Sequence, residues 1–184
     1  TAKSDSELVT QVDSQCQQII IDTIMQNFPS HGFLAEEGKD NKLSKQFPRG
    51  DNDFWWLIDP IDGTNNYSQQ ILCFCVSIGL IYQGRAVLGV IYDPATDSMF
   101  TAAGDSPAQY NNINVRANDK DIEYYQTLGI ESLFSDGVPA WLTRLQTMCR
   151  CRSLGTTALH LAYVAKGSFI GGIMHNPKLW DFAA

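Results

Sequence analysis

The sequence has 184 residues, of which 44% are hydrophobic and 18% charged, and its formal net charge is −7. These values are typical of one folded domain with a substantial core and exclude a disordered chain. The negative charge argues against nucleic acid as a partner, and the absence of an apolar run of roughly 20 residues argues against a membrane span.

The first predicted element is an amphipathic helix that ends before Pro29. Asp13 lies in its first turn, where a carboxylate also suits the helix dipole. The apolar positions that recur at helical spacing are Val12, Cys16, Ile19, Ile20, Ile24 and Phe28.

A short strand is predicted at residues 32–35, directly before two acids, Glu36 and Glu37. Neighbouring residues of a strand face opposite sides, so only one of these glutamates can point into a shared site. A solvated charge pair is the simpler alternative. Residues 38–52 are rich in Lys, Asn, Arg and Gly and predict a surface loop.

The central stretch begins with four apolar residues, 55–58, which predict a buried strand. Pro60 fixes its own backbone and restricts the residue before it, so we expect the chain to turn there. Two carboxylates, Asp59 and Asp62, therefore lie close together at the end of a strand.

Gly63 and Thr64 follow, where a helix is expected to begin with backbone N–H groups that can hold an anion. Hard oxygen ligands beside an anion site suggest a divalent cation and a phosphate. Magnesium fits because it takes few carboxylates and shares its coordination shell with phosphate oxygens. An ordinary Asp/Pro/Gly turn is the alternative.

The next part of the chain predicts an antiparallel meander that acts as scaffold. Its strands are expected at residues 73–82, 86–92, 98–102 and 111–115.

A helix is then predicted at 139–149, a strand at 151–154 and a second helix at 158–166, closed by Gly167. Three residues precede the second helix, Gly155, Thr156 and Thr157, and N-capping by Thr156 explains them without a functional role. Near the end of the sequence we expect a short helix that begins at Asp181.

The cysteines are Cys16, Cys73, Cys75, Cys149 and Cys151. Their two Cys-x-Cys pairs could hold a soft metal ion, because alternate strand residues share a face. No Cys-x-x-Cys pair or nearby histidine completes the spacing of a zinc site. The start of the chain is not a signal peptide, so we expect reduced core thiols in a cytoplasmic protein.

Several of these segments resemble the motifs of one family in order and spacing. Asp-Pro-Ile-Asp-Gly-Thr at 59–64 and Trp-Asp-x-Ala-Ala at 180–184 are similar to the two signatures of the inositol monophosphatase family, which are metal-dependent phosphomonoesterases. The Val-Thr-x-x-Asp segment at 9–13 and the acid at Glu36 match its companion motifs. The resemblance covers nearly the whole chain.

The fold implied by this resemblance is α/β (α+β), a layered αβαβα sandwich of the inositol monophosphatase and fructose-1,6-bisphosphatase type. We expect a single phosphatase domain, with an antiparallel sheet in residues 1–115 and a smaller mixed sheet in residues 116–184. Members usually carry further residues at both ends, so we expect this sequence to be incomplete. Homodimers are common in the family.

The resemblance also implies a set of two to three Mg²⁺ ions. One is held by Glu36, Asp59 and the backbone carbonyl of Ile61, and a second by Asp59, Asp62 and Asp181. A third, weaker ion shares Glu36 with water. The ions activate a water molecule for attack on a phosphate monoester and stabilise the leaving oxygen.

The remaining roles follow from the same resemblance. Thr64, oriented by Asp13, accepts or positions the proton of the attacking water, and the N–H groups of Gly63 and Thr64 hold the phosphate. The substrate pocket is assigned to Gly155, Thr156 and Thr157. Met174 occupies the position where inositol-selective members place a glutamate that binds a substrate hydroxyl.

The expected reaction is the lithium-sensitive hydrolysis of a small polyol phosphate, such as a myo-inositol phosphate. Within the family, histidinol phosphate, fructose-1,6-bisphosphate and nucleotide 3′-phosphates are alternative substrates. A non-catalytic module that binds metal or phosphate is the alternative from another class. No nucleic acid or membrane is expected as a partner.

Overall fold

The computed structural model describes residues 2–4, 7–8, 11–38, 43–131 and 137–184. The helices in these ranges are α1 (Gln11–Asn27), α2 (Thr64–Ser68), α3 (Ala140–Met148), α4 (Thr157–Ala165) and α5 (Leu179–Phe182). The strands are β1 (Ala2–Ser4), β2 (Glu7–Leu8), β3 (Gly32–Ala35), β4 (Ser44–Gln46), β5 (Phe54–Asp62), β6 (Cys75–Tyr82), β7 (Arg85–Asp93), β8 (Ser98–Ala103), β9 (Gln109–Tyr110), β10 (Ile113–Asn114), β11 (Thr127–Ile130), β12 (Arg150–Arg152) and β13 (Gly171–Ile173).

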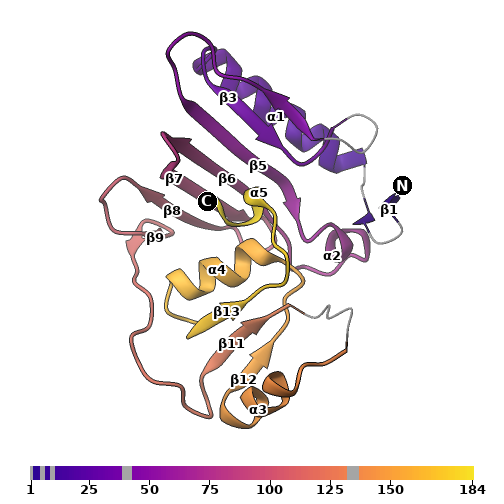
Figure 1. Cartoon of the computed structure of the whole chain (residues 1–184), viewed down its shortest axis with the longest axis vertical. Coiled ribbons are helices and arrows are strands. Elements are labelled where there is room, and N and C mark those ends of the chain that lie inside the picture. Colours follow the sequence, from indigo (N-terminus) through magenta and orange to yellow (C-terminus); the bar gives the residue numbers. More distant parts are fainter. Residues whose placement is uncertain (1, 5–6, 9–10, 39–42, 132–136) are drawn as a thin grey trace.

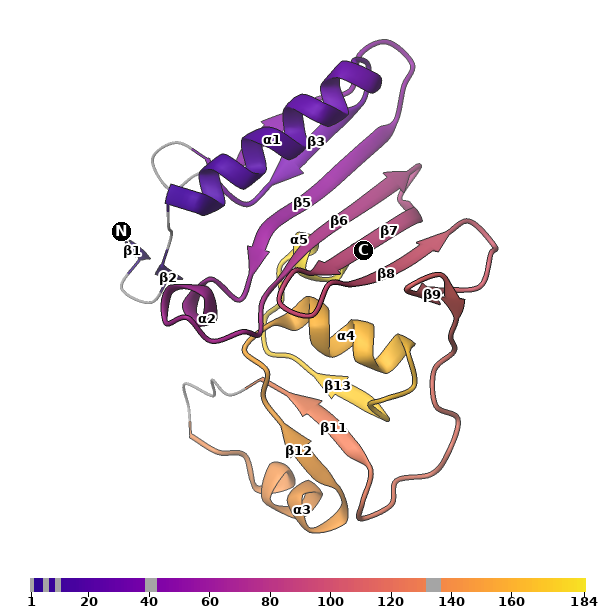
Figure 2. The same ribbon diagram turned by 180° about the vertical axis from the view of Figure 1, so that it is seen from behind.

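These elements stack in five layers (Figure 1). Helix α1 covers one face of an eight-stranded sheet, and α4 and α5 lie on the other face. A three-stranded sheet follows on the far side of α4, with α3 outermost, as the reverse view also shows (Figure 2). The predicted αβαβα sandwich is confirmed.

The larger sheet has the order β10-β9-β8-β7-β6-β5-β3-β4. Its neighbouring strands are antiparallel except β3 and β5, which are parallel. The predicted meander is confirmed from β6 to β8. Strand β4 lies inside the stretch predicted to be a loop, because its backbone pairs with β3 at the edge of the sheet, a contact that local composition does not reveal. Residues 39–42 of that loop lie outside the described residues.

Strand β5 connects the core to the functional end of the sheet. Trp56 and Ile58 pack against Ile21 and Ile24 of α1 in one core cluster. The strand continues to Asp62, although a turn was predicted at Pro60. The register with β6 shifts between residues 59 and 62, so the proline is accommodated by a local irregularity and not by the end of the strand.

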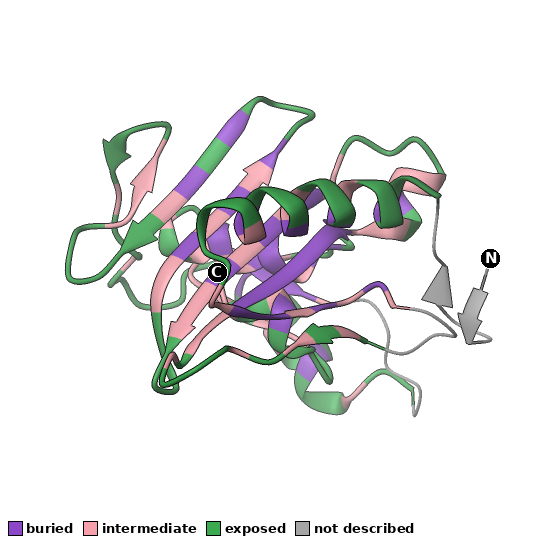
Figure 3. Ribbon diagram, turned by 90° about the horizontal axis from the view of Figure 1, so that it is seen from above, coloured by how far each residue is buried: buried purple, intermediate pink, exposed green. Residues whose placement is uncertain are grey.

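Helix α1 is present as predicted, but its buried face is different from the one the apolar pattern indicated. Its buried residues are Asp13, Gln17, Ile21 and Ile24. Val12 and Ile19, which belong to the predicted apolar stripe, are exposed. The outward face of α1 is solvent-exposed over much of its length (Figure 3). Two polar residues displace the apolar stripe because their side chains make contacts in the interior.

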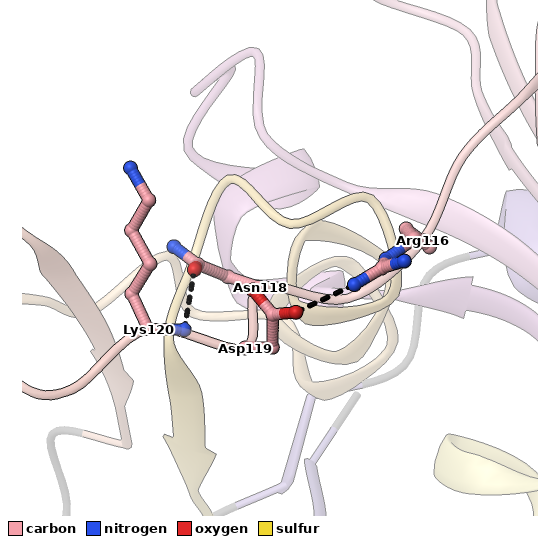
Figure 4. Close-up of polar contacts among 4 residues, drawn as sticks. All are labelled: Arg116, Asn118, Asp119 and Lys120. Atoms are coloured by element: carbon pink, nitrogen blue, oxygen red, sulfur yellow. Dashed lines mark hydrogen bonds and ion pairs between the residues drawn. The ribbon is translucent and has the colours of Figure 1, made fainter.

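The smaller sheet has the order β12-β11-β13, and both of its strand pairs are parallel, where a mixed sheet was expected. Its strands are short, and β11 and β13 were not predicted. The segment that leads from β10 into this sheet contains an ion pair between Arg116 and Asp119 at 2.6 Å, and Asn118 accepts a hydrogen bond from the backbone N–H of Lys120 (Figure 4).

Helix α5 begins at Leu179, two residues before the predicted start at Asp181. It is seated on β6, where Ser77 donates a hydrogen bond to the carbonyl of Trp180 at 3.0 Å. A Cβ at Gly79 would lie 2.5 Å from the carbonyl oxygen of Ala183, so only glycine permits this approach.

All five cysteines are free, and Cys75 and Cys149 are buried in core clusters. Within the described ranges, no helix is both long and apolar enough to cross a membrane.

Candidate functional site

A polar cavity of about 230 Å³ lies where β5 ends, and residues of both sheets and of α5 line it. Its carboxylates are Glu36, Asp59, Asp62, Glu131 and Asp181. Its other lining residues include Ile61, Gly63, Thr64, Thr157 and Lys178. A larger hollow of about 440 Å³ on the sheet is lined by apolar residues and glycine, with no charged side chain. The chemistry therefore belongs to the polar cavity.

Asp59 is the carboxylate on which the negative charge of the cavity converges. Its side chain is 3% exposed, and its Oδ1 accepts the backbone N–H of Ile61 at 3.1 Å. Burial is the largest cause that raises the pKa of Asp59 well above its usual value, and repulsion from Glu36, Asp62 and Asp181 adds to it. Such a cluster gains stability from bound protons or cations.

Asp62 is held by the first turn of α4. Its two oxygens accept the backbone N–H groups of Thr157 at 3.2 Å and Ala158 at 2.6 Å. Burial raises the pKa of Asp62 to about 7, although these hydrogen bonds favour the charged form. Cys75 contacts the same carboxylate, with its Sγ 3.8 Å from Oδ2.

Asp181 enters the cavity from the first turn of α5, where it accepts the backbone N–H of Lys178 at 2.7 Å. Partial burial is the largest cause that raises its pKa to about 6. The charge of Glu36 raises this pKa further, whereas the contacts to Lys178 lower it.

The half-buried Thr64 and the buried Asp13 form a polar pair beside these carboxylates. The Thr64 hydroxyl lies 3.1 Å from Oδ1 of Asp13 and 3.0 Å from the carbonyl oxygen of Ile61. A hydroxyl has one proton, so it donates to one of these acceptors at a time and keeps its lone pairs for a donor in the cavity. Asp13 is fully buried on α1, which explains why the helix turns this polar residue inward.

The segment before α4 is tied to the Asp-Gly-Thr turn by Asn66. Its Nδ2 donates to the carbonyls of Cys73 and Leu154, both at 2.7 Å. Gly155 adopts φ +72°, and a Cβ there would lie 2.8 Å from the same Nδ2. Sequence reasoning missed Asn66, although its place two residues after Thr64 in α2 was a signal.

The structure brings together most of the predicted site residues in one cavity, but not all. Thr156 caps α4, accepting the N–H of Leu159 at 3.0 Å, and neither it nor Gly155 is among the residues that line the cavity. Met174 does not line the cavity either. A Cβ on Gly172 would lie 3.2 Å from its sulfur, so the thioether packs over that glycine.

Glu131 and Lys178 line the cavity and were not predicted. Glu131 follows the short strand β11, which the sequence pattern did not reveal. Lys178 precedes the Trp-Asp motif in the sequence, and the resemblance gave it no role.

The donor atoms of this cavity are oxygens, which suits hard divalent cations such as Mg²⁺. Among the described residues, no three His, Cys, Asp or Glu side chains are already gathered tightly enough to form a metal cluster. The raised pKa values of Asp59, Asp62 and Asp181 nonetheless fit a site in which cations offset carboxylate repulsion.

The model of the inositol monophosphatase family matches residues 1–184. A protein named Nus factor SuhB from Escherichia coli strain K12 is 34% identical, with 99% of this chain and 68% of that protein covered. An inositol-1-monophosphatase from Rhizobium meliloti is 31% identical, with the same two coverages.

Solved structures of related proteins have the same fold. The extragenic suppressor protein suhB from Bartonella henselae superposes with a TM-score of 0.90 at 32% identity, covering 100% of this chain and 70% of that one. An IMPase/NADP phosphatase complexed with Mg²⁺ and phosphate superposes with a TM-score of 0.84 at 29% identity, covering 100% and 68%.

Proposed function

This chain belongs to the inositol monophosphatase family, and from that premise we propose that it hydrolyses the phosphate monoester of a small polyol in a magnesium-dependent reaction. The observation that carries the proposal is the Thr64–Asp13 hydrogen bond at the edge of a cavity lined by buried carboxylates. A module that only binds metal or phosphate has no need of such a pair.

The proposed magnesium ligands are those expected from the sequence. Glu36, Asp59 and the carbonyl of Ile61 would hold one ion, and Asp59, Asp62 and Asp181 a second, with a third sharing Glu36. All five residues line the cavity. When bound, the ions supply a Lewis acid that activates water and neutralises charge on the leaving oxygen. The Mg²⁺ and phosphate in a related phosphatase structure support magnesium as the metal.

The proposed role of Thr64 is to receive or position the proton of the attacking water. Its hydroxyl can donate a hydrogen bond either to Asp13 or to the carbonyl of Ile61. If that carbonyl serves a cation, Asp13 is the remaining acceptor. The Thr64 oxygen is then oriented with its lone pairs toward the cavity, where a water can donate to it.

The proposed phosphate contacts are backbone groups at the start of α2. Gly63 and Thr64 both line the cavity, and Gly63 adopts φ +96°, a conformation that favours glycine. Lys178 is the one lysine or arginine among the described lining residues. Cations are therefore needed to balance a phosphate among the carboxylates.

The decisive experiment is a phosphate-release screen over a panel of monoesters, with magnesium and with a chelator. The panel contains inositol 1-phosphate, histidinol phosphate, fructose-1,6-bisphosphate, a nucleotide 3′-phosphate and NADP. We expect turnover of inositol 1-phosphate only with magnesium. Phosphate binding without turnover of any ester would favour the binding module, and preference for another ester would transfer the proposal to that substrate.

Three further properties belong to the same proposal. We expect lithium to inhibit turnover, and undiminished activity at high lithium would contradict this. We also expect a homodimer, which sedimentation would test, and a cytoplasmic location, which cell fractionation would test.

A further inference from the structure

Glu131 is a carboxylate of the cavity that the proposed metal set does not use. It follows β11 of the smaller sheet, whereas Glu36 follows β3 and Asp59 and Asp62 lie in β5, both strands of the larger sheet. The residue therefore approaches the cavity from the opposite sheet.

The backbone of Glu131 is fixed by the last residue of β13, and its side chain by the segment that follows. Its N–H donates to the carbonyl of Ile173 at 3.0 Å, as a continuation of the parallel pairing between β11 and β13. The backbone N–H of His175 donates to its Oε2. A carboxylate has acceptor positions for about four hydrogen bonds, so this contact leaves capacity for another donor.

The charge pattern separates Glu131 from the other carboxylates. Glu36, Asp62 and Asp181 are the acids that raise the pKa of Asp59. Glu131 acts instead on Asp181, as the smallest of the causes that shift the pKa of that residue. Glu131 thus lies at the margin of the charge cluster.

A carboxylate in that position limits what can lie against it. It repels a second phosphate or carboxylate of a substrate and accepts hydrogen bonds from hydroxyl groups. Met174, where the resemblance led us to look for a contact to substrate, packs over Gly172 outside the cavity lining.

We propose that Glu131 is a specificity-determining residue, which accepts a hydrogen bond from a hydroxyl group on the alcohol part of the phosphate monoester. This inference rests on the proposed phosphatase function. It deepens that function by naming the preferred substrate class, a neutral polyol carrying a single phosphate, and it disfavours bisphosphates.

The test compares two substrates with rings of similar size. Inositol 1-phosphate carries hydroxyl groups, and cyclohexyl phosphate carries none. We expect Glu131→Ala to lower kcat/KM for inositol 1-phosphate about ten- to a hundredfold, which is typical for the loss of a hydrogen bond to a charged group. Glu131→Gln retains a neutral acceptor and should lose less. Activity toward cyclohexyl phosphate should stay within about twofold of the unmodified chain.

Two controls accompany these variants. Glu123→Gln makes the same chemical change at an exposed residue outside the cavity and should leave kcat/KM for both substrates unchanged. Magnesium titration followed by tryptophan fluorescence should give the same affinity in the Glu131 variants as in the unmodified chain. If Glu131→Ala is unfolded by circular dichroism, Glu131→Gln carries the comparison.

The possible failures are distinguishable. Hydrolysis of neither ester by the unmodified chain would overturn the proposed function, and this inference with it. The inference alone would be overturned if the unmodified chain hydrolyses both esters and the Glu131 variants either keep their kcat/KM for both or lose it equally for both. Weakened magnesium binding in those variants would also overturn it, because Glu131 would then belong to the metal site.

Discussion

At the scale of single residues, Asp59 is where the electrostatic demands of the site are concentrated. It is buried, and three neighbouring acids raise its pKa. The proposed ligand set gives it contact with two cations, so its charge is the one that the site can least replace.

We therefore predict that Asp59→Asn lowers magnesium-dependent kcat at least about a hundredfold, since the charge stabilisation supplied by metal ions is worth several kcal/mol. The measurement is phosphate release over a magnesium titration. Asp105→Asn, at an exposed position between β8 and β9, is the matched control. Equal losses in the two variants would contradict the role of Asp59.

A second prediction concerns Thr64 and Asp13, which are joined at 3.1 Å. Thr64→Ala and Asp13→Asn should each reduce kcat by about a hundredfold or more while magnesium affinity changes little. Because the two residues act as a unit, the double variant should be little worse than either single one.

Ser68→Ala is the control for this pair, since it removes a hydroxyl from α2 that only contacts the carbonyl of Asn65. Additive losses in the double variant would show that Thr64 and Asp13 act independently. Loss of folded structure in Asp13→Asn would be detected by circular dichroism before the kinetics are compared.

At the scale of elements, the sequence predicted those whose signals are local. The helical spacing before Pro29 predicted α1, and the strands predicted at 73–82 and 86–92 correspond to the antiparallel pair β6 and β7. The Asp-Gly-Thr motif identified the end of β5 where the cavity forms. Each of these depends on residues within a few positions of one another.

Elements that depend on distant partners were missed or misjudged. Strands β11 and β13 have four and three residues, and they pair with each other across more than 40 positions of the chain. Glu131 was missed with them. The prediction of the buried face of α1 was wrong because Asp13 and Gln17 bind partners elsewhere in the chain. An apolar pattern does not reveal such contacts.

The connection between α2 and α4 gives a prediction at this scale. Asn66 holds the carbonyls of Cys73 and Leu154 and so fixes the segment whose N–H groups bind Asp62. Asn66→Asp removes both donors and takes the side-chain partner from two partly buried carbonyls. We predict a loss of about 1–3 kcal/mol in the free energy of unfolding, or more, together with a lower kcat.

The measurements for this prediction are thermal unfolding and phosphate release. Asn65→Asp, on the exposed neighbouring residue, makes the same chemical change without these contacts. An equal effect in both variants would mean that added charge on α2 matters, and not the hydrogen bonds of Asn66.

At the scale of the whole molecule, the site draws its groups from the ends of both sheets and from helices α1, α2, α4 and α5. Asp62 is fixed by α4, Asp181 by α5, and Asp13 by α1. Carboxylates gathered from separate elements repel one another, so the docking of those elements is coupled to how that charge is neutralised.

This coupling predicts how pH affects the metal-free protein. The folded-state pKa values of Asp62 and Asp181 are raised from 3.8 to about 7 and about 6. A raised pKa means that the folded state binds more protons than the unfolded one. The stability that these groups contribute is therefore present below about pH 4 and is lost as pH rises through 6 and 7.

Magnesium should reverse this loss, because it binds the ionised carboxylates of the folded state and must compete with protons at low pH. We predict that magnesium at a hundredfold excess over its Kd adds about 2.7 kcal/mol to the free energy of unfolding at about pH 8, or about 5–10 °C in Tm. At about pH 5 the added stability should be much smaller.

Because histidines also titrate in this pH range, the quantity to measure is the difference in stability between samples with magnesium and with chelator. Burial lowers the pKa of His31 and His160, so their contribution to stability grows as pH rises, opposite to that of the carboxylates. His31 stacks between Phe28 and Phe54, away from the cavity lining, and His160 accepts the N–H of Leu154. Neither of these two lines the cavity, so both contributions should cancel between samples with magnesium and with chelator. The third histidine, His175, does line the cavity and stays with the groups that do not cancel.

The groups that face the titrating carboxylates from neighbouring elements still affect this magnesium-dependent difference in stability. Glu36, Lys178 and Glu131 act on Asp181, and Cys75 contacts Asp62. Asp181→Asn should reduce the magnesium-induced rise in Tm and shift its pH dependence upward, toward the pKa of Asp62, whereas Asp105→Asn should leave both unchanged. A rise in Tm that is equal at about pH 5 and pH 8 would show that magnesium binds without displacing protons, and would place its site away from these carboxylates.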